Sequence, residues 1–272
     1  MLTISASLVL YNNPPAVFEP CIRSWLASPA RGELIVVDNS PQPIRSALFD
    51  QPGIRYLQAP RNVGFGAAHN IALAALDGCS DLHIFLNPDV VFGADTLGTL
   101  SASFEQDHMI AAAMPRILYP DRSQQKLCKL LPTPFDLIVR RFLPNSRAAQ
   151  RRIADYELHR LPADQIAEVP SISGCFLVAR TRFLPPGARF DERFFMYMED
   201  VDLVRRLNDH GKVMYLPNCE VTHEYAKGSY RSRRLLVYHI ISAVRYFNKW
   251  GWISDPVRDT RNRSALQQID RE

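Results

Sequence analysis

Short apolar runs alternate with helix-like stretches along the first hundred residues. Four of these runs have the length and apolar content of buried strands, and they cover residues 5–10, 34–37, 54–57 and 82–86. Apolar residues with helical spacing between or after them lie at residues 18–26, 67–76 and 96–104. Strands that alternate with helices form right-handed βαβ units, so the pattern predicts an α/β fold with a mostly parallel central sheet flanked by helices.

Polar side chains follow three of the predicted strands at the point where each strand ends. Tyr11 follows the first strand, Asp38 the second, and Asn87 and Asp89 the fourth. In open sheets of this kind a ligand binds beyond the carboxyl ends of the strands. The sequence therefore predicts a binding site at this edge of the sheet.

The middle and the second half of the chain are less regular. Residues 119–169 are rich in Arg and Pro, which indicates a partly helical insertion over the site. Core character returns at residues 169–180. An amphipathic helix is predicted at residues 199–208, and a short strand at residues 213–216.

The last fifty residues are predicted to form a separate extension. We place the main domain at residues 1–222 and the extension at residues 223–272, where ten Lys and Arg face five Asp and Glu. Residues 231–250 fit an amphipathic helix with a basic edge. We expect the polar residues after about 255 to be frayed. One stripe of the helix would carry Leu236, Ile240, Ala243, Phe247 and Trp250, and another Arg231, Arg234, Tyr238, Ser242, Arg245 and Lys249.

The composition is that of a packed globular protein. Of 272 residues, 47% are hydrophobic and 22% are charged, which excludes a disordered or collagen-like chain. The five cysteines lie more than 40 residues apart, which argues against a disulfide framework and favours a reducing, cytoplasmic compartment. We expect no signal peptide and no membrane span. The net charge of +4 comes with no nucleic-acid-binding motif, so no nucleic-acid partner is expected.

The segment Asn87-Pro88-Asp89 is the first candidate for chemistry. A carboxylate at a strand end suits a hard divalent cation, because Mg²⁺ is held by one or two carboxylates and by substrate phosphates. The alternative is that Asn-Pro-Asp is a simple turn. Taken alone, the sequence favours the turn.

The second candidate is the acidic start of the helix at residues 199–208. Glu199, Asp200 and Asp202 serve the helix dipole at the very least. Neighbouring negative charges also raise the pKa of a carboxyl group and make it a better proton acceptor. Glu199 or Asp200 is therefore a candidate general base.

Two further features gain weight only in context. His223 is a candidate ligand if it lies near Asp89, and residues 227–231, which include Arg231, add phosphate-binding groups. The glycines Gly64 and Gly66 open a predicted helix, but the third glycine of a dinucleotide fingerprint is absent. Exposed N–H groups at such a helix start could still face a nucleotide.

Taken in order, seven segments resemble those of family-2 inverting glycosyltransferases with the GT-A (nucleotide-diphospho-sugar transferase) fold. The match is most similar to bacterial rhamnosyltransferases of O-antigen or cell-wall synthesis. It spans roughly residues 3 to 232, with a gap over the insertion. The segments are SLVLYNN, LIVVDNS, NVGFGAAHN, FLNPDV, SGCFLVAR, FFMYMEDVDLVRRL and VTHEYAKGSYRS.

The resemblance implies a role for each matching residue. It places Tyr11 and Asp38 at the base and ribose of a nucleotide sugar, with dTDP-L-rhamnose as the expected donor. It places Asn62 and Gly64 in the loop that closes over that donor. Asp89 matches the last acidic residue of the family's DxD metal motif, in which Asn87 takes the first place, and His223 matches a further ligand of Mg²⁺ or Mn²⁺. Asp200 matches the catalytic base.

The resulting hypothesis is a single displacement that inverts the anomeric carbon. Asp200 would deprotonate a hydroxyl of a saccharide or lipid-linked acceptor, while a cation at Asp89 and His223 assists the departing nucleotide diphosphate. The basic helix at residues 231–250 either packs on the main domain or rests on the anionic inner face of the cell membrane. The latter would make the protein peripheral to the membrane.

Three other interpretations stay open on the sequence alone. The donor could be UDP-galactofuranose, UDP-glucose or UDP-N-acetylglucosamine. The chain could be a nucleotide-sugar-binding component of a polysaccharide assembly complex without turnover. A nucleotidyltransferase is disfavoured, because residues 1–22 lack the basic residues of a triphosphate loop.

Overall fold

The structure is a computed structural model that describes residues 2–76, 80–143, 146–184, 189–224 and 232–271. Its strands are β1 (Ile4–Leu10), β2 (Leu34–Asp38), β3 (Ile54–Gln58), β4 (Leu82–Leu86), β5 (Val90–Phe92), β6 (Ile110–Leu118), β7 (Ala167–Glu168), β8 (Phe176–Arg180) and β9 (Lys212–His223). Its α-helices are α1 (Pro15–Ala27), α2 (Phe65–Ala75), α3 (Thr96–Gln106), α4 (Pro134–Phe142), α5 (Arg147–Tyr156), α6 (Glu199–Leu207), α8 (Arg233–Trp250) and α9 (Pro256–Arg271). Short 3₁₀ turns cover Ala47–Asp50 and Thr181–Phe183.

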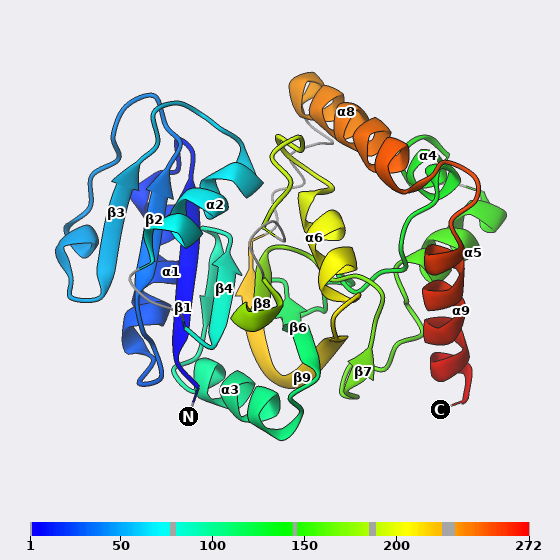
Figure 1. The fold of residues 1–272 in the computed structure, drawn as a ribbon, viewed down its shortest axis with the longest axis horizontal. Helices are drawn as coiled ribbons and strands as arrows, with labels where there is room; N and C mark the ends of the chain where they lie inside the picture. The colour runs from blue at the N-terminus through cyan, green and yellow to red at the C-terminus, as the bar shows by residue number, and fades with distance from the viewer. Residues whose placement is uncertain (1, 77–79, 144–145, 185–188, 225–231, 272) are drawn as a thin grey trace.

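One mixed sheet runs through the described part of the molecule (Figure 1). Its strands follow the order β3-β2-β1-β4-β8-β6-β9-β5, and β7 pairs with β9 outside this order. The predicted βαβ half is confirmed, since β1 lies parallel to both β2 and β4, and β2 lies parallel to β3. The antiparallel strands lie beyond β4, where β8 pairs with β4 and with β6.

Alternating side chains fix two helices to opposite faces of this half. Leu8 of β1 belongs to the core cluster that contains Phe18 of α1. Val9, the next residue, belongs to a second cluster with Ala68 and Ala72 of α2. Successive side chains of a strand point to opposite faces, so α1 and α2 cover the two sides of the same strands.

Two strands differ from the sequence-based expectation. The strand predicted at residues 213–216 is part of the 12-residue β9, which continues to His223. Beyond Pro217 its residues alternate, with Cys219 and Val221 buried and Asn218 exposed. The sequence pattern does not predict strand β6, because its apolar run contains small alanine side chains and Pro115. These two strands pair in parallel, and β9 carries His223 to the edge where β4 ends.

The insertion and the C-terminal segment pack together on the side of α6 that lies away from strands β1–β4 (Figure 1). The insertion is partly helical, as predicted, with α4 and α5. The prediction of a frayed end is wrong, since residues after Asp255 form α9. Asn262 of α9 hydrogen-bonds both the N–H and the carbonyl of Leu131, at 2.8 and 2.9 Å. The division into residues 1–222 and 223–272 stays a prediction.

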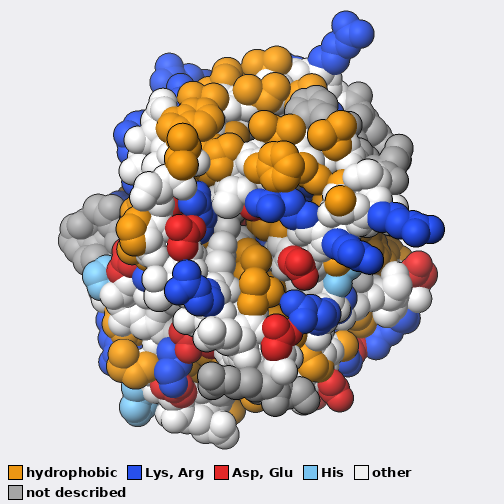
Figure 2. All heavy atoms as spheres, turned by 90° about the vertical axis from the view of Figure 1, so that its right-hand side faces the viewer, with side chains coloured by type: hydrophobic (Ala, Val, Ile, Leu, Met, Phe, Trp, Pro, Cys, Tyr) orange, Lys and Arg blue, Asp and Glu red, His pale blue; other side chains and the backbone are white. Residues whose placement is uncertain are grey.

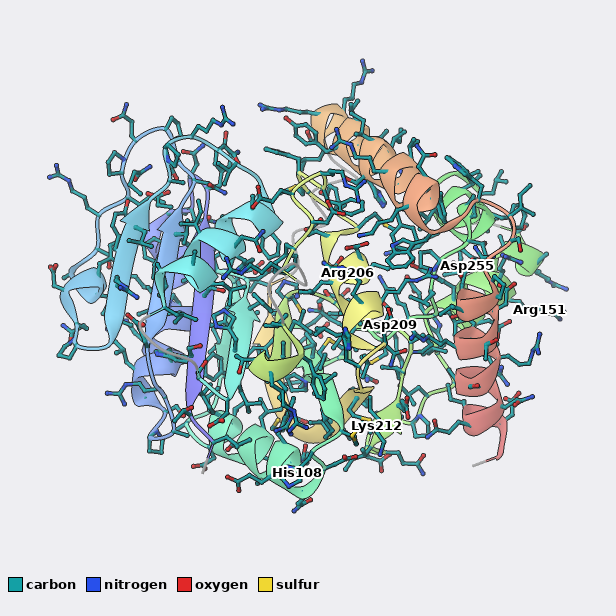
Figure 3. The ribbon with its side chains drawn as sticks, in the orientation of Figure 1. His108, Arg151, Arg206, Asp209, Lys212 and Asp255 are labelled. Carbon is teal, nitrogen blue, oxygen red and sulfur yellow. The ribbon has the colours of Figure 1, made fainter. Side chains whose placement is uncertain are left out.

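A buried ion pair ties the start of α9 to α6. Both guanidinium NH groups of Arg205 donate to Asp255, at 2.6 and 2.7 Å, and both side chains are buried. Asp255, labelled in Figure 3, lies at the turn between α8 and α9. The Arg205 guanidinium also lies 4.1 Å from the ring centre of Trp250, at the end of α8.

The buried stripe of α8 is only partly the one predicted. Ala243, Phe247 and Trp250 pack inward with Phe194 and Met198, as expected for their stripe. Ser242 and Tyr246 are buried as well, because Ser242 donates to the carbonyl of Met196 and Tyr246 joins the cluster.

Ile240, assigned to the inner stripe, is instead 49% exposed.

No helix among the described residues is long and apolar enough to cross a membrane.

Candidate active site

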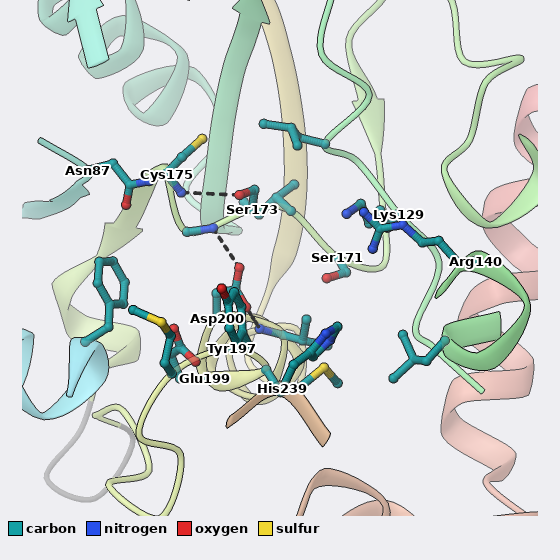
Figure 4. A pocket seen from close by; sticks show the side chains of 18 of the residues that line it. Asn87, Lys129, Arg140, Ser171, Ser173, Cys175, Tyr197, Glu199, Asp200 and His239 are labelled. Carbon is teal, nitrogen blue, oxygen red and sulfur yellow. Dashed lines mark hydrogen bonds between the residues drawn. The ribbon is translucent and has the colours of Figure 1, made fainter. Parts of the chain in front are cut away.

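The edge of the sheet beyond β4 and β9 holds a cavity of about 310 Å³ (Figure 4). Asn87 follows β4, His223 ends β9 and Asp200 lies in the first turn of α6, and all three line the cavity. Because β8 runs antiparallel to β4, Gly174 and Cys175 just before β8 meet the end of β4, and the N–H of Asn87 donates to the carbonyl of Cys175 at 2.9 Å. Residues predicted from separate segments are thus brought to one site.

Asp89 and His223 lie side by side at one corner of this edge. Oδ1 of Asp89 is 3.3 Å from Nε2 of His223, and Nδ2 of Asn87 is 3.4 Å from the same nitrogen. Nδ1 of His223 lies 3.0 Å from Oε1 of Gln125, which orients the ring. The spacing of the three predicted residues fits a shared ligand. Gln125 is a positioning residue that no pattern in the sequence indicates.

This corner suits a divalent cation on its chemistry. Oδ1 of Asp89 is buried, and the described residues offer it no hydrogen bond beyond its ion-pair contact with the ring of His223. Burial opposes the charged form of His223, but Cys175 and Asp89 outweigh it and raise the pKa of this imidazole to about 10, so a cation would have to displace a proton from the ring in order to bind. Among the described residues, no group of three or more His, Cys, Asp or Glu side chains is placed to hold a metal ion. The corner thus provides two protein ligands, and phosphate oxygens would complete the shell.

The backbone places Asp200 firmly in the cavity. Its Oδ2 accepts from the N–H of Gly174 at 2.9 Å, and its Oδ1 accepts from the N–H of Val201 at 2.8 Å. Tyr197 and Met198 have positive φ angles of 68° and 66°, so the chain turns sharply just before α6. Non-glycine residues in this region are uncommon and cluster at functional sites.

The other two acidic residues of α6 have different surroundings. Glu199 also lines the cavity but is buried, and its Oε2 has no hydrogen-bond partner among the described residues. Burial and the nearby charge of Asp200 raise the pKa of Glu199 well above its usual range. Asp202 is fully buried and pairs with Arg206 and Lys249, so it serves to hold α6 and α8 together. A catalytic part for Glu199 stays a prediction.

The predicted nucleotide side lies at the ends of β1 and β2. Tyr11 is 45% exposed there. Asp38 is fully buried and accepts from the N–H groups of Ser40 and Ile44, both at 2.8 Å, and from the hydroxyl of Tyr56 at 2.7 Å. This carboxylate therefore fixes the loop after β2, and its contact with a nucleotide stays a prediction.

The loop of Asn62 and Gly64 is attached to both halves of the site. Oδ1 of Asn62 accepts from the N–H of Gly64 at 3.1 Å, and the amide of Asn39 donates to the carbonyl of Gly64 at 3.0 Å. On the other side, the N–H of Phe65 donates to the carbonyl of Phe195 at 3.0 Å. The loop thus links the strand ends to the segment that carries Asp200. Arg231 lies outside the described residues.

The comparison with protein families assigns the chain to a known family. The model of glycosyl transferase family 2 matches residues 5–155, which is more than half of the chain. The chain belongs to this family. A rhamnosyltransferase of Mycobacterium tuberculosis, named N-acetylglucosaminyl-diphospho-decaprenol L-rhamnosyltransferase, is 30% identical over 241 residues, which cover 82% of this chain and 76% of that protein. The rhamnosyltransferase WbbL of Escherichia coli is 27% identical over 67% of this chain and 69% of its own.

Solved structures of low identity support the same fold. A GalNAc-T7 structure with UDP, GalNAc and Mn²⁺ matches 82% of this chain and 43% of its own, with a TM-score of 0.61 and 14% identity. The mannosyltransferase PcManGT of Pyrobaculum calidifontis, solved with GDP-Man and Mn²⁺, matches 99% of this chain and 75% of its own, with a TM-score of 0.57 and 14% identity. The predicted GT-A fold is therefore confirmed for this family-2 glycosyltransferase.

Proposed function

We propose that this glycosyltransferase transfers L-rhamnose from dTDP-L-rhamnose, with inversion, to a lipid-linked saccharide acceptor of surface polysaccharide synthesis. The observation that carries the proposal is that Asn87, His223 and Asp200 line the same cavity, with Asp89 next to His223. The two rhamnosyltransferases that the chain resembles support the sugar. The diphospho-decaprenol in the name of the mycobacterial relative supports a lipid-linked acceptor.

Each part of the site has its own task in this proposal. Asp89 and His223 would hold Mg²⁺ or Mn²⁺, which when bound supplies charge neutralisation to the departing dTDP. Asp200 accepts the proton of the acceptor hydroxyl, and the N–H groups of Gly174 and Val201 fix the direction of its oxygens. The loop of Asn62 and Gly64 covers the donor, and Tyr11 lies by the base.

A face of the C-terminal region supports work at a membrane surface. Apolar side chains of α8 and α4 are exposed next to each other, and Figure 2 shows hydrophobic side chains gathered at the top of that face. Arg233, Arg234 and Arg245 of α8 are exposed too. We propose that this face rests on the anionic inner surface of the cell membrane, where basic residues each contribute about 1 kcal/mol. The exposed apolar residues are Phe135, Ile138, Val237, Ile240, Ile241 and Val244.

Release of free nucleotide diphosphate from a panel of donors tests the proposed reaction. The purified protein is incubated with an N-acetylglucosaminyl diphosphate lipid, with and without Mn²⁺, and with dTDP-L-rhamnose, UDP-galactofuranose, UDP-glucose or UDP-N-acetylglucosamine. We expect acceptor-dependent release from dTDP-L-rhamnose above the other donors. Preference for a UDP-sugar would overturn the donor, and binding of dTDP-L-rhamnose without any transfer would indicate a non-catalytic component.

A further inference from the structure

Three cationic side chains gather in the part of the cavity formed by the insertion. Lys129 lies beside the 171–175 segment, since its N–H donates to the carbonyl of Ser171 at 2.9 Å. Arg140 and Arg141 come from the last turn of α4, and all three residues line the cavity. In Figure 4, Lys129 and Arg140 lie on one side of Asp200, and Asn87 lies on the other.

These cations are close enough to repel one another. Burial, with the charge of Arg140, lowers the pKa of Lys129 to about 8, although Glu157 and Asp200 act in the opposite direction. Burial also lowers the pKa of His239 in the same cavity to about 4, and Arg140, Arg141 and Lys129 add to this effect. Like charges that lie together in a partly buried cavity repel one another, so a bound anion would stabilise their placement.

The carboxyl groups near these cations have contacts or tasks of their own. Glu157 pairs with Nε of Arg140 at 2.9 Å and lies 3.2 Å from His159 as well. Asp200 is the candidate base, and its oxygens already accept two backbone hydrogen bonds. Glu199 lines the cavity too, but burial and the charge of Asp200 raise its pKa well above its usual range. Each of these carboxyl groups is therefore committed to another contact or task.

The other side of α4 has the opposite character. Phe135 and Ile138 are 54% and 49% exposed, while Arg140 and Arg141 line the cavity. A soluble helix normally turns its charged residues to water and its apolar residues inward. Leu137 of α4 also lines the cavity and Val139 is buried, so the helix is packed inward as well. Cations in the cavity beside apolar side chains at the outer surface suit a ligand with an anionic group and an apolar chain.

We propose that Lys129, Arg140 and Arg141 form a subsite for the phosphate groups of the acceptor, separate from the donor corner at Asp89 and His223. The assignment rests on the proposed transfer to a lipid-linked acceptor and adds the diphosphate as the group that the protein recognises. Guanidinium and ammonium groups both bind phosphate oxygens, and Arg does so with two parallel hydrogen bonds. The acceptor sugar would then lie between this subsite and Asp200.

Direct binding of farnesyl diphosphate tests the subsite without any turnover. Titrations in EDTA, followed by calorimetry, remove binding that depends on a cation at the donor corner. We expect farnesyl diphosphate to bind wild-type protein, farnesol to bind far more weakly, and inorganic pyrophosphate to compete. Lys129→Met and Arg141→Gln should each weaken the binding of farnesyl diphosphate by about 10-fold to 100-fold, as the loss of a charge-assisted hydrogen bond does.

A matched variant separates this subsite from general charge effects. Arg151, labelled in Figure 3, is exposed on α5, and Arg151→Gln should bind farnesyl diphosphate as wild type does. Lys129→Met should also raise the melting temperature at pH 7, because a half-buried cation with a lowered pKa is removed, so a loss of binding cannot come from unfolding. Equal affinity in Lys129→Met, Arg141→Gln and wild type, or no binding by wild type, would overturn the subsite. Absence of rhamnosyl transfer with binding intact would count against the proposed function alone.

Discussion

The N–H of Gly174 donates to Oδ2 of Asp200 at 2.9 Å, which joins the residue before Cys175 to the first turn of α6. A Cβ on Gly174 would lie 3.0 Å from the Cβ of Asp200, so the two segments approach as closely as side chains allow. The carboxylate is therefore held in one orientation at the cavity before any acceptor arrives. A proton acceptor positioned in advance avoids the cost of ordering it during the reaction.

Replacing the proposed base by its amide tests this arrangement. Asp200→Asn should lower kcat by at least about 100-fold, because general-base catalysis contributes roughly 10²–10⁴-fold. Some stability is lost as well, since an amide cannot accept both backbone hydrogen bonds. The measurement is the rate of dTDP release with acceptor present, together with circular dichroism. The control is Asp209→Asn, which changes an exposed carboxylate just after the same helix. Turnover near the wild-type rate in Asp200→Asn would remove this residue from the base role.

Removal of the donor-corner carboxylate should abolish the response to metal. Asp89→Ala takes away the oxygen ligand next to His223. Only one of the two proposed protein ligands of the cation would then remain. We expect wild-type transfer to stop in EDTA and return with Mn²⁺ or Mg²⁺, and Asp89→Ala to show no such recovery. Asp95→Ala, at an exposed position before α3, serves as the control. Equally fast wild-type transfer in EDTA would show that no cation is required.

The backbone at Gly64 admits no other residue without strain. Its φ is 96°, and an added Cβ would lie 2.3 Å from the carbonyl oxygen of Phe195. Gly64→Ala should therefore destabilise the protein by roughly 1–3 kcal/mol and weaken donor binding, because the loop must move away from Phe195. Gly98→Ala in α3 meets no atom within 4 Å and should instead add about 0.5–1 kcal/mol. Urea denaturation of both variants checks the sign of each effect, and equal stability would contradict the close approach.

A buried polar network beneath α2 makes stability depend on pH. His83 lies 2.8 Å from both Ser5 and Ser7, and burial lowers its pKa to about 3. Below pH 6.5 the unfolded chain binds a proton at His83 that the folded protein does not, so the free energy of unfolding falls by about 1.4 kcal/mol per pH unit from this residue. His83→Gln should reduce the slope by about 0.7 kcal/mol per pH unit at pH 6.5 and by about 1.4 kcal/mol per pH unit at pH 5. The exposed His210→Gln is the control, and an unchanged slope in His83→Gln would contradict the prediction.

The first half of the fold could be predicted because local pattern and tertiary structure agree there. Each apolar run became a strand of the parallel sheet, and Asn87, Asp89 and Asp200 stand at ends of elements that the pattern locates. The match of several segments in order supplied the family, which no single motif does. The comparison with family 2 confirms that inference.

Other features depend on contacts between distant segments and left no local signal. The wrong expectation for α9 followed from its polar composition, whereas Asn262 and Asp255 hold it through paired hydrogen bonds to Leu131 and Arg205, which lie far away in the sequence. Lys129 reaches the cavity only because the insertion folds over the site. The inward turn of Tyr246 could not be read from α8 alone, since its partners Phe194 and Met198 come from another segment.

The proposed membrane face can be tested by changing its apolar side chains only. Ile240 is 49% exposed on α8, among Val237, Ile241 and Val244, and it contributes apolar area that an interface would bury. Ile240→Asp should weaken co-sedimentation with vesicles that contain anionic lipid by about 10-fold, because it loses apolar contact and adds a repelled charge. Val257→Asp on α9, with 45% exposure in the starting residue, is the matched control. Wild-type binding should fall at high salt and be weak on neutral vesicles, since the exposed arginines of α8 attract anionic headgroups. Equal binding to both kinds of vesicle, or equal binding of Ile240→Asp and wild type, would rule out this face as the contact.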